Sequence, residues 1–167
     1  MNYKDMFSKW GISGIKLNLA FLEVEFTASA DDQKAAWEMY VELITRIVTQ
    51  EFEMNIGDEL TALESVYSLF SSTRAILKEN GRQARSFSKI AIIVLNQIIR
   101  PFTAKWHREQ LNGAFKNKEK CAEFREDLTC FQKEMRKYSA MLAEIAAVED
   151  ITDINNACQE DMIQQPK

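Results

Sequence analysis

The apolar residues from position 31 onward recur at helical spacing in four successive segments. The predicted helices cover about residues 31–51, 59–79, 83–110 and 118–148. Asn80-Gly81 and Asn112-Gly113 mark helix stops, because Asn and Gly tolerate the left-handed conformation at a helix end. Short connections between long helices favour antiparallel neighbours. The pattern therefore predicts an all-α protein, an up-down antiparallel four-helix bundle.

The fourth segment carries the most regular of these patterns. Its apolar positions are three and four residues apart in strict alternation, at Cys121, Phe124, Leu128, Phe131, Met135, Tyr138, Leu142 and Ile145. An unbroken heptad seam of this kind packs a helix against its neighbours along its whole length. We expect it to pack inside the bundle, and an intermolecular coiled coil is the alternative.

The segment 14–26 has a different pattern, with apolar residues at alternate positions and a one-residue slip in the middle. Such alternation predicts an extended strand with a β-bulge. No other segment reads clearly as a strand, so its backbone groups need another partner. It must form a hairpin on itself, lie along the bundle, or pair with another chain, as in a two-fold dimer that exchanges the strand.

Nothing in the sequence divides the chain into separate domains. The 167 residues include 5 Gly and 2 Pro, without an internal repeat or a linker. We predict a single domain over residues 1–167. Its N-terminal arm covers residues 1–28, the bundle covers 31–148, and a short helix (Asp150–Cys158) and tail fill 149–167.

The composition indicates a cytoplasmic globular protein without metal or cofactor. The three cysteines form no CxxC pair and the chain has one histidine, which excludes a Cys/His zinc cluster. The N-terminal MNYKDMFSKWG lacks the layout of a signal peptide. The longest apolar run, residues 90–99, is too short to cross a bilayer, so we expect no membrane partner.

Positive charge is concentrated in one part of a chain whose net charge is −4. Residues 82–120 contain 9 Lys and Arg against 2 Asp and Glu, and both flanking regions are acidic. A possible basic patch consists of Arg82, Arg85, Lys105, Arg108, Lys116, Lys118 and Lys120. The patch would serve an anion or a nucleic acid. Because these residues gather at the two ends of the third segment, a solvated rim is the favoured interpretation.

A line of polar side chains interrupts the apolar third segment, at Lys89, Asn96, Arg100, Thr103 and His107. Their spacing puts them on one side of the helix. Pro101 lacks an N–H and predicts a kink that frees the carbonyl of Gln97. We expect Arg100 to be buried, so it needs a carboxylate, and the candidates are Glu38, Glu42, Glu59 and Glu64. The line is then a structural network that fixes the register of the helices.

Arg100 and His107 also form the motif RPFTAKWH, which is R-x6-H. In spacing it resembles the R-x4-6-H signature of the HEPN superfamily, small helical bundles that include metal-independent ribonucleases. The resemblance implies that Arg100 stabilises the scissile phosphate and that His107 acts as general acid and base, in a site completed across a dimer. Pro101 stands where the family usually has a small polar residue.

The remaining motifs favour interaction over catalysis. The sequence has no glycine-rich phosphate loop, no nucleophile elbow and no Glu-x-x-His pair for a di-metal centre. We therefore expect a bacterial, non-enzymatic interaction or accessory protein, bound to itself as a homodimer or to another protein. Small helical proteins of this class are common in multi-gene systems such as phage defence. The alternative is a HEPN-like ribonuclease, or an inactive relative, that uses Arg100 and His107.

Overall fold

The computed structural model describes residues 2–12, 15–16, 24–53, 57–80 and 82–154. Within these ranges the chain is predominantly helical and contains no β-strand, which confirms the all-α class. The helices are α1 (Tyr3–Lys9), α3 (Ala30–Ile44), α4 (Glu59–Glu79), α5 (Arg85–Val94), the π-helical η1 (Leu95–Ile99), α6 (Arg100–Leu111), the 3₁₀-helical η2 (Ala114–Lys116) and α7 (Lys118–Ala146).

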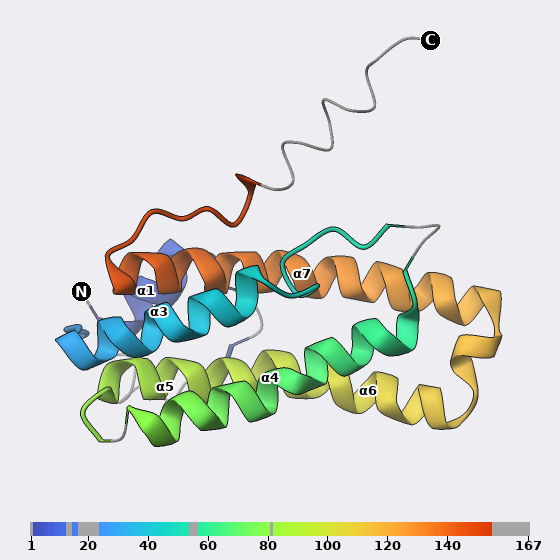
Figure 1. The fold of residues 1–167 in the computed structure, drawn as a ribbon, viewed down its shortest axis with the longest axis horizontal. Coiled ribbons are helices and arrows are strands. Elements are labelled where there is room, and N and C mark those ends of the chain that lie inside the picture. The colour runs from blue at the N-terminus through green and yellow to red at the C-terminus, as the bar shows by residue number, and fades with distance from the viewer. Residues whose placement is uncertain (1, 13–14, 17–23, 54–56, 81, 155–167) are drawn as a thin grey trace, which may run out of the picture.

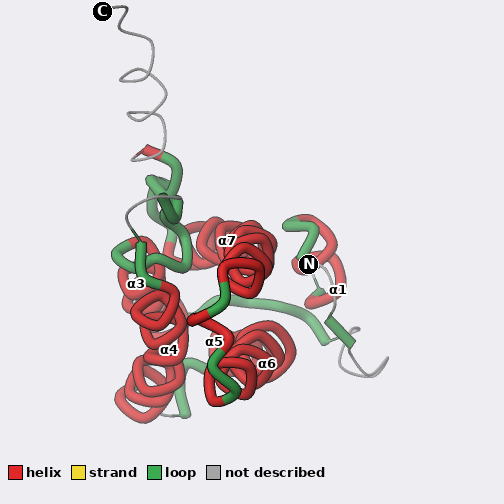
Figure 2. The backbone as a smooth tube through the Cα atoms, turned by 90° about the vertical axis from the view of Figure 1, so that its right-hand side faces the viewer, coloured by secondary structure: helices red, strands yellow, loops and turns green. Residues whose placement is uncertain are grey.

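The long helices lie side by side and reverse direction from one to the next, with α5, η1 and α6 forming one continuous rod (Figure 1). Viewed along the rods, α3, α4, the α5–α6 rod and α7 surround a common core, and α1 lies outside it, near α7 (Figure 2). The most buried large side chains of the core include Trp106, Tyr40, Tyr138, Phe87, Phe124, Leu43, Leu63, Leu69 and Ile90.

The heptad seam of α7 is buried within the chain. Its residues from Phe124 to Ile145 are 5% exposed or less, and Cys121 at its start is half-buried. The helices of the same chain cover this seam, so the prediction of packing inside the protein is confirmed. The alternative of an intermolecular coiled coil along the seam is wrong.

The first predicted helix is too long at its C-terminal end. Helix α3 ends at Ile44, and the next residues form turns. The reason is that side chains satisfy the backbone there. The Thr49 hydroxyl donates to the Leu43 carbonyl at 2.9 Å, and the buried amide of Gln132 donates to the carbonyls of Ile47 and Gln50 at 2.7 and 2.6 Å. These bonds replace the ones that a continued helix would make.

Pro101 is accommodated by a π-helical turn. The N–H of Arg100 bonds to the carbonyl of Leu95, five residues back, so η1 carries one extra residue just before the proline. Pro101 then lies in the first turn of α6, where a missing N–H is tolerated. The Gln97 side chain in η1 accepts from the Lys16 N–H at 2.6 Å and donates to the Lys16 carbonyl at 2.9 Å.

The predicted strand 14–26 falls mostly outside the described residues. Of its described part, Glu25 forms an isolated antiparallel bridge with Asn2, and Lys16 is held by η1. These contacts tie Glu25 to the residue before α1 and Lys16 to η1.

The short helix predicted for Asp150–Cys158 does not begin at Asp150. Residues 150–153 are not helical, and 155–158 lie outside the described residues. The Tyr40 hydroxyl instead accepts from the Ile151 N–H at 2.7 Å and donates to Asp150 at 3.2 Å, which fastens this segment to α3. The Tyr40 side chain on α3 thus accepts from a backbone N–H that would be without a partner at the start of a helix.

Candidate interaction site on α4 and α6

The five polar side chains of the third predicted segment do not form a buried network. Lys89, Asn96 and Arg100 are exposed, His107 is half-buried, and only Thr103 is buried. The Thr103 hydroxyl donates to the carbonyl of Ile99 at 3.1 Å, inside its own helix. Each of the other four contacts a neighbouring side chain at the surface. Arg100 and His107 contact side chains of α4.

The expectation that Arg100 is buried against a carboxylate is wrong. Among the described residues no carboxylate oxygen lies within salt-bridge distance of Arg100, since Glu42 pairs with Arg46 and Glu59 with Arg125. Arg100 donates from Nε to Asn96 Oδ1 at 3.1 Å, and its guanidinium lies 5.0 Å from the ring centre of Phe70 on α4. The helix position of Arg100 faces solvent beside α4, where the guanidinium keeps its hydration and needs no counter-charge.

A second arginine lies against the Phe70 ring. The guanidinium of Arg74 lies 5.8 Å from the same ring centre, and Arg74 is exposed. The Phe70 ring itself is 5% exposed. Cation–π contacts of exposed cations contribute about 0.5–1 kcal/mol each, so they orient these guanidiniums more than they stabilise the fold.

His107 lies against another aromatic residue of α4. Its ring is edge-on to Tyr67, with ring centres 4.8 Å apart and an angle of 79° between the planes. Tyr67 is 53% exposed and also contacts Phe70 at 5.4 Å. Tyr67, Arg74 and Arg100 thus contact Phe70, and His107 contacts Tyr67. We name these four side chains the α4/α6 face: Tyr67, Arg74, Arg100 and His107.

Exposed leucines extend the α4/α6 face at one end. Leu60 lies two helical turns before Tyr67 on α4, and Leu111 lies one turn after His107 on α6. Because α4 and α6 run in opposite directions (Figure 1), both leucines lie at the same end of the face. Leu111 is 84% exposed and Leu60 37%. The whole surface combines arginine, tyrosine and leucine, a composition suited to contact with another molecule.

Two residues of the predicted basic patch are neutralised by carboxylates. Lys105 pairs with Glu123 at 2.9 Å and with Asp127 at 2.7 Å. Lys120 pairs with Glu123 at 2.8 Å and with Glu109 at 3.4 Å. Hydrogen bonds from Lys120 and Lys105 lower the pKa of Glu123 to about 2, so this network stays fully ionised near neutral pH.

The other basic residues are divided between two ends of the molecule. Arg82 and Arg85 lie at the start of α5, whereas Arg108, Lys116 and Lys118 lie around the far turn between α6 and α7, and all five are exposed. Trp106, the aromatic residue next to Lys105, is fully buried and donates from Nε1 to Asp127 at 3.0 Å, so it cannot stack on a base. The seven residues therefore do not form one continuous patch.

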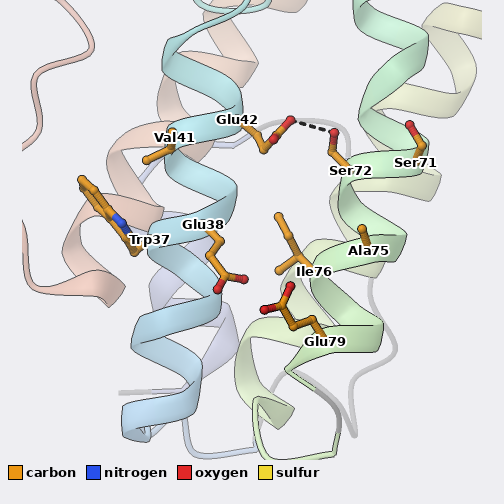
Figure 3. Close-up of a pocket in the computed structure, with 9 residues that line it drawn as sticks. All are labelled: Trp37, Glu38, Val41, Glu42, Ser71, Ser72, Ala75, Ile76 and Glu79. Atoms are coloured by element: carbon orange, nitrogen blue, oxygen red, sulfur yellow. Dashed lines mark hydrogen bonds between the residues drawn. The ribbon is translucent and has the colours of Figure 1, made fainter.

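A shallow groove between α3 and α4 is the second surface feature beside α4 (Figure 3). Its volume is about 570 Å³, and it is lined by Trp37, Glu38, Val41, Glu42, Ser71, Ser72, Ala75, Ile76 and Glu79. Glu38 accepts from the Asn80 amide at 2.7 Å, and Lys34 lies 3.6 Å from Glu38 and 3.9 Å from Glu79. Lys34 thus offsets part of the acidic charge of the groove.

Glu42 in this groove is a structural ion. Burial alone would raise the pKa of Glu42, but hydrogen bonds from Ser72 and Arg46 outweigh burial and hold the pKa below its ordinary value. Arg46 in turn donates to Ser68 at 2.5 Å and to Ser72 at 3.1 Å. These bonds tie α3 to α4, so Glu42 supports the packing of the two helices.

Sequence reasoning found Arg100 and His107 but missed their neighbours on α4. Nothing in the sequence analysis links Tyr67, Phe70 or Arg74 with Arg100 and His107. The spacing offers one signal that could have found them, because Tyr67, Phe70 and Arg74 are three and four residues apart and so share a helix face. The pairing of α4 with α6 cannot be derived from spacing within either helix.

The described residues offer neither a metal centre nor a membrane span. They contain no group of three or more His, Cys, Asp and Glu side chains placed to hold a metal ion. Among them, every helix is too short or too polar to cross a bilayer. The fold and the α4/α6 face therefore define a small all-α protein with an arginine-rich aromatic surface. Comparison with protein families, curated proteins and solved structures finds no significant match.

Proposed function

We propose that this protein is a non-enzymatic interaction protein and that it binds an acidic segment of a partner protein through the α4/α6 face. One observation carries the proposal. Arg74 and Arg100 share the Phe70 ring, and neither has a carboxylate partner among the described residues. Guanidinium groups bind carboxylates through two parallel hydrogen bonds, so two oriented, unpaired guanidiniums form a receptor for acidic side chains.

The aromatic and apolar parts of the same surface support a protein partner. Tyr and Arg are the residues most enriched among those that dominate binding energy at protein interfaces. Tyr67 is half-exposed beside the two arginines, and the exposed Leu60 and Leu111 extend the surface with apolar area. An interface needs such a centre, surrounded by contacts that exclude water.

We expect a photo-crosslinker at position 67 to capture the partner. In the native host, Tyr67→p-benzoylphenylalanine should give a discrete crosslinked product, because position 67 lies at the centre of the proposed contact. The added changes Arg74→Glu and Arg100→Glu should abolish the product, since they turn attraction for an acidic segment into repulsion. Mass spectrometry of the product distinguishes a second copy of the chain from another protein.

The matched control places the same crosslinker at position 37. Trp37 is also an exposed aromatic residue, but it lies on α3, at the groove between α3 and α4. The proposal fails if positions 37 and 67 give the same products, or if the charge reversal leaves the position 67 product unchanged. Arg74→Glu and Arg100→Glu should each cost no more than about 1 kcal/mol of unfolding free energy, because each removes an exposed cation–π contact and Arg100→Glu also removes one surface bond to Asn96. Lost crosslinking then cannot be attributed to unfolding.

A ribonuclease is the second candidate, favoured by the accessibility of Arg100 and His107 on one face. The two residues are two helical turns apart, roughly 10 Å along the axis. If Arg100 and His107 form a HEPN-like site, single-stranded RNA should be cleaved in the presence of EDTA, and His107→Ala should abolish cleavage. We expect no cleavage by the wild-type protein. Cleavage that depends on His107 would replace the interaction proposal.

The proposal extends to the topology of the fold and to the cellular setting of the protein. We take the frame to be an up-down antiparallel four-helix bundle, supported by the reversal of direction from α3 to α7 (Figure 1). We place the protein in the cytoplasm of a bacterium, as an accessory component of a multi-gene system such as phage defence. The thiols of Cys121 and Cys130 are free, which fits a reducing compartment. If the acidic segment belongs to a second copy of this chain, the protein forms a homodimer.

A further inference from the structure

A small pocket lined by basic residues lies at the start of α5. It has a volume of about 350 Å³ and is lined by Arg82, Arg85, Ser88 and Lys89. Three of these four side chains carry a positive charge, and all three are exposed. A concave surface lined by charges of one sign concentrates ions of the opposite sign. The pocket is therefore suited to an anion.

The local geometry holds the cations of this pocket together. Arg85 and Lys89 are four residues apart on α5 and share one helix face. Nε of Arg85 donates to the carbonyl of Arg82 at 3.2 Å, which fixes the Arg85 side chain across the turn into the helix. The Ser88 hydroxyl donates to the carbonyl of Ala84 at 2.6 Å, so it completes the wall and leaves the charge to its neighbours.

Carboxylates do not neutralise the two arginines of this pocket. Among the described residues, Arg82 and Arg85 take part in no salt bridge. Asp32, the acidic residue that contacts the first turn of α5, is 2% exposed. One of its oxygens accepts from the Phe87 N–H and the other from Ser29. Its charge is used inside the protein, so the arginines face solvent without a counter-charge.

We propose that this pocket binds a phosphate group, carried by a small soluble molecule or by a lipid headgroup. Arg82 and Arg85 supply guanidinium groups, whose planar fork fits two phosphate oxygens. Lys89 lines the same pocket, with its ammonium 5.4 Å from the ring centre of Tyr3. The pocket shares no residue with the α4/α6 face, so the two proposals can fail separately.

Titration of the full chain with inorganic phosphate tests this proposal by NMR. We expect saturable shifts of the backbone amides in the first turn of α5, relative to chloride at the same ionic strength. Arg85→Gln should weaken binding by about tenfold or more, because it removes one charge-assisted bidentate contact. The matched control is Arg108→Gln, an exposed arginine on α6 outside the pocket, which should bind as the wild type does. Unchanged shifts elsewhere in the spectrum verify the fold of each variant.

The source of the phosphate is decided by vesicles of phosphatidylcholine with and without phosphatidylinositol 4-phosphate. Sedimentation with the phosphorylated vesicles that depends on Arg85 identifies a lipid headgroup as the ligand. Saturable binding of inorganic phosphate without vesicle binding identifies a soluble ligand, and both results support the pocket. Shifts that do not saturate, that chloride reproduces, or that persist in Arg85→Gln would overturn it.

Discussion

Replacing Arg125 by alanine should lower the free energy of unfolding by about 3 kcal/mol, because it leaves a buried carboxylate without its partner. The side chains of Arg125 on α7 and Glu59 at the start of α4 are each 13% exposed, and Nε donates to Glu59 at 2.7 Å. Nη1 and Nη2 donate to the carbonyls of Glu53 and Gly57, both at 2.9 Å. One guanidinium therefore fixes both the loop before α4 and the helix itself.

Urea unfolding followed by circular dichroism measures this effect. Arg125→Lys should recover part of the loss, since an ammonium keeps the charge but cannot reach Glu59 and two carbonyls with one planar group. Lys133→Ala, an exposed change on the same helix, should alter stability by less than about 0.5 kcal/mol. If Arg125→Ala lowers the free energy of unfolding no more than Lys133→Ala does, the bonds from Arg125 to Glu59 and the two carbonyls do not stabilise the fold.

The sequence predicts the long helices well because their signals are local. The second predicted helix coincides with α4, and Asp58 caps it by accepting from the Thr61 N–H at 2.8 Å. The heptad seam of α7 identifies the core side of that helix from Phe124 to Ile145. Apolar periodicity and caps depend only on residues within a few turns, so they can be recognised without knowing the partner helix.

The errors arise where distant residues decide the local structure. The first predicted helix stops early because Gln132, far along the chain, binds the carbonyls that a longer helix would use. Arg100 was expected in the core because its neighbours are apolar, but its place beside Phe70 on α4 depends on how two helices pair. The kink expected at Pro101 takes the form of a π-turn, which adds one residue and keeps the rod continuous. None of these outcomes follows from spacing alone.

The residues of the candidate site and those of the framework differ in the contacts that hold them. The residues that hold the framework form several hydrogen bonds, as the half-buried Arg125 does. Arg74 and Arg100 are exposed and lie against the same Phe70 ring, and Arg100 also donates one hydrogen bond to Asn96. Changes at the first kind of residue should lower stability, whereas changes at the second kind should leave stability nearly intact and affect binding. Measuring stability and crosslinking on the same variants separates the two roles.

Replacing Asp32 by alanine should cost about 2–4 kcal/mol of unfolding free energy, because this carboxylate caps two helices at once. Asp32 is 2% exposed, and Oδ2 accepts from the Ser29 N–H at 3.0 Å in the capping box of α3. Oδ1 accepts from the Phe87 N–H of α5 at 2.8 Å. The residue before α5 is Ala84, which has no side-chain cap of its own, so α5 relies on Asp32 for this bond.

Asp31 provides the matched control, since it is the adjacent acidic residue in the first turn of α3 and is exposed. Asp31→Ala should cost less than about 1 kcal/mol, because it removes only a charge near the helix N-terminus. Asp32→Asn should fall between the two alanine variants, since an amide oxygen can still accept from Phe87 but its NH₂ group faces the Ser29 N–H. Faster hydrogen exchange at the Phe87 amide should accompany Asp32→Ala. Equal losses for Asp31→Ala and Asp32→Ala would mean that Asp32 acts by charge alone and does not join α3 to α5.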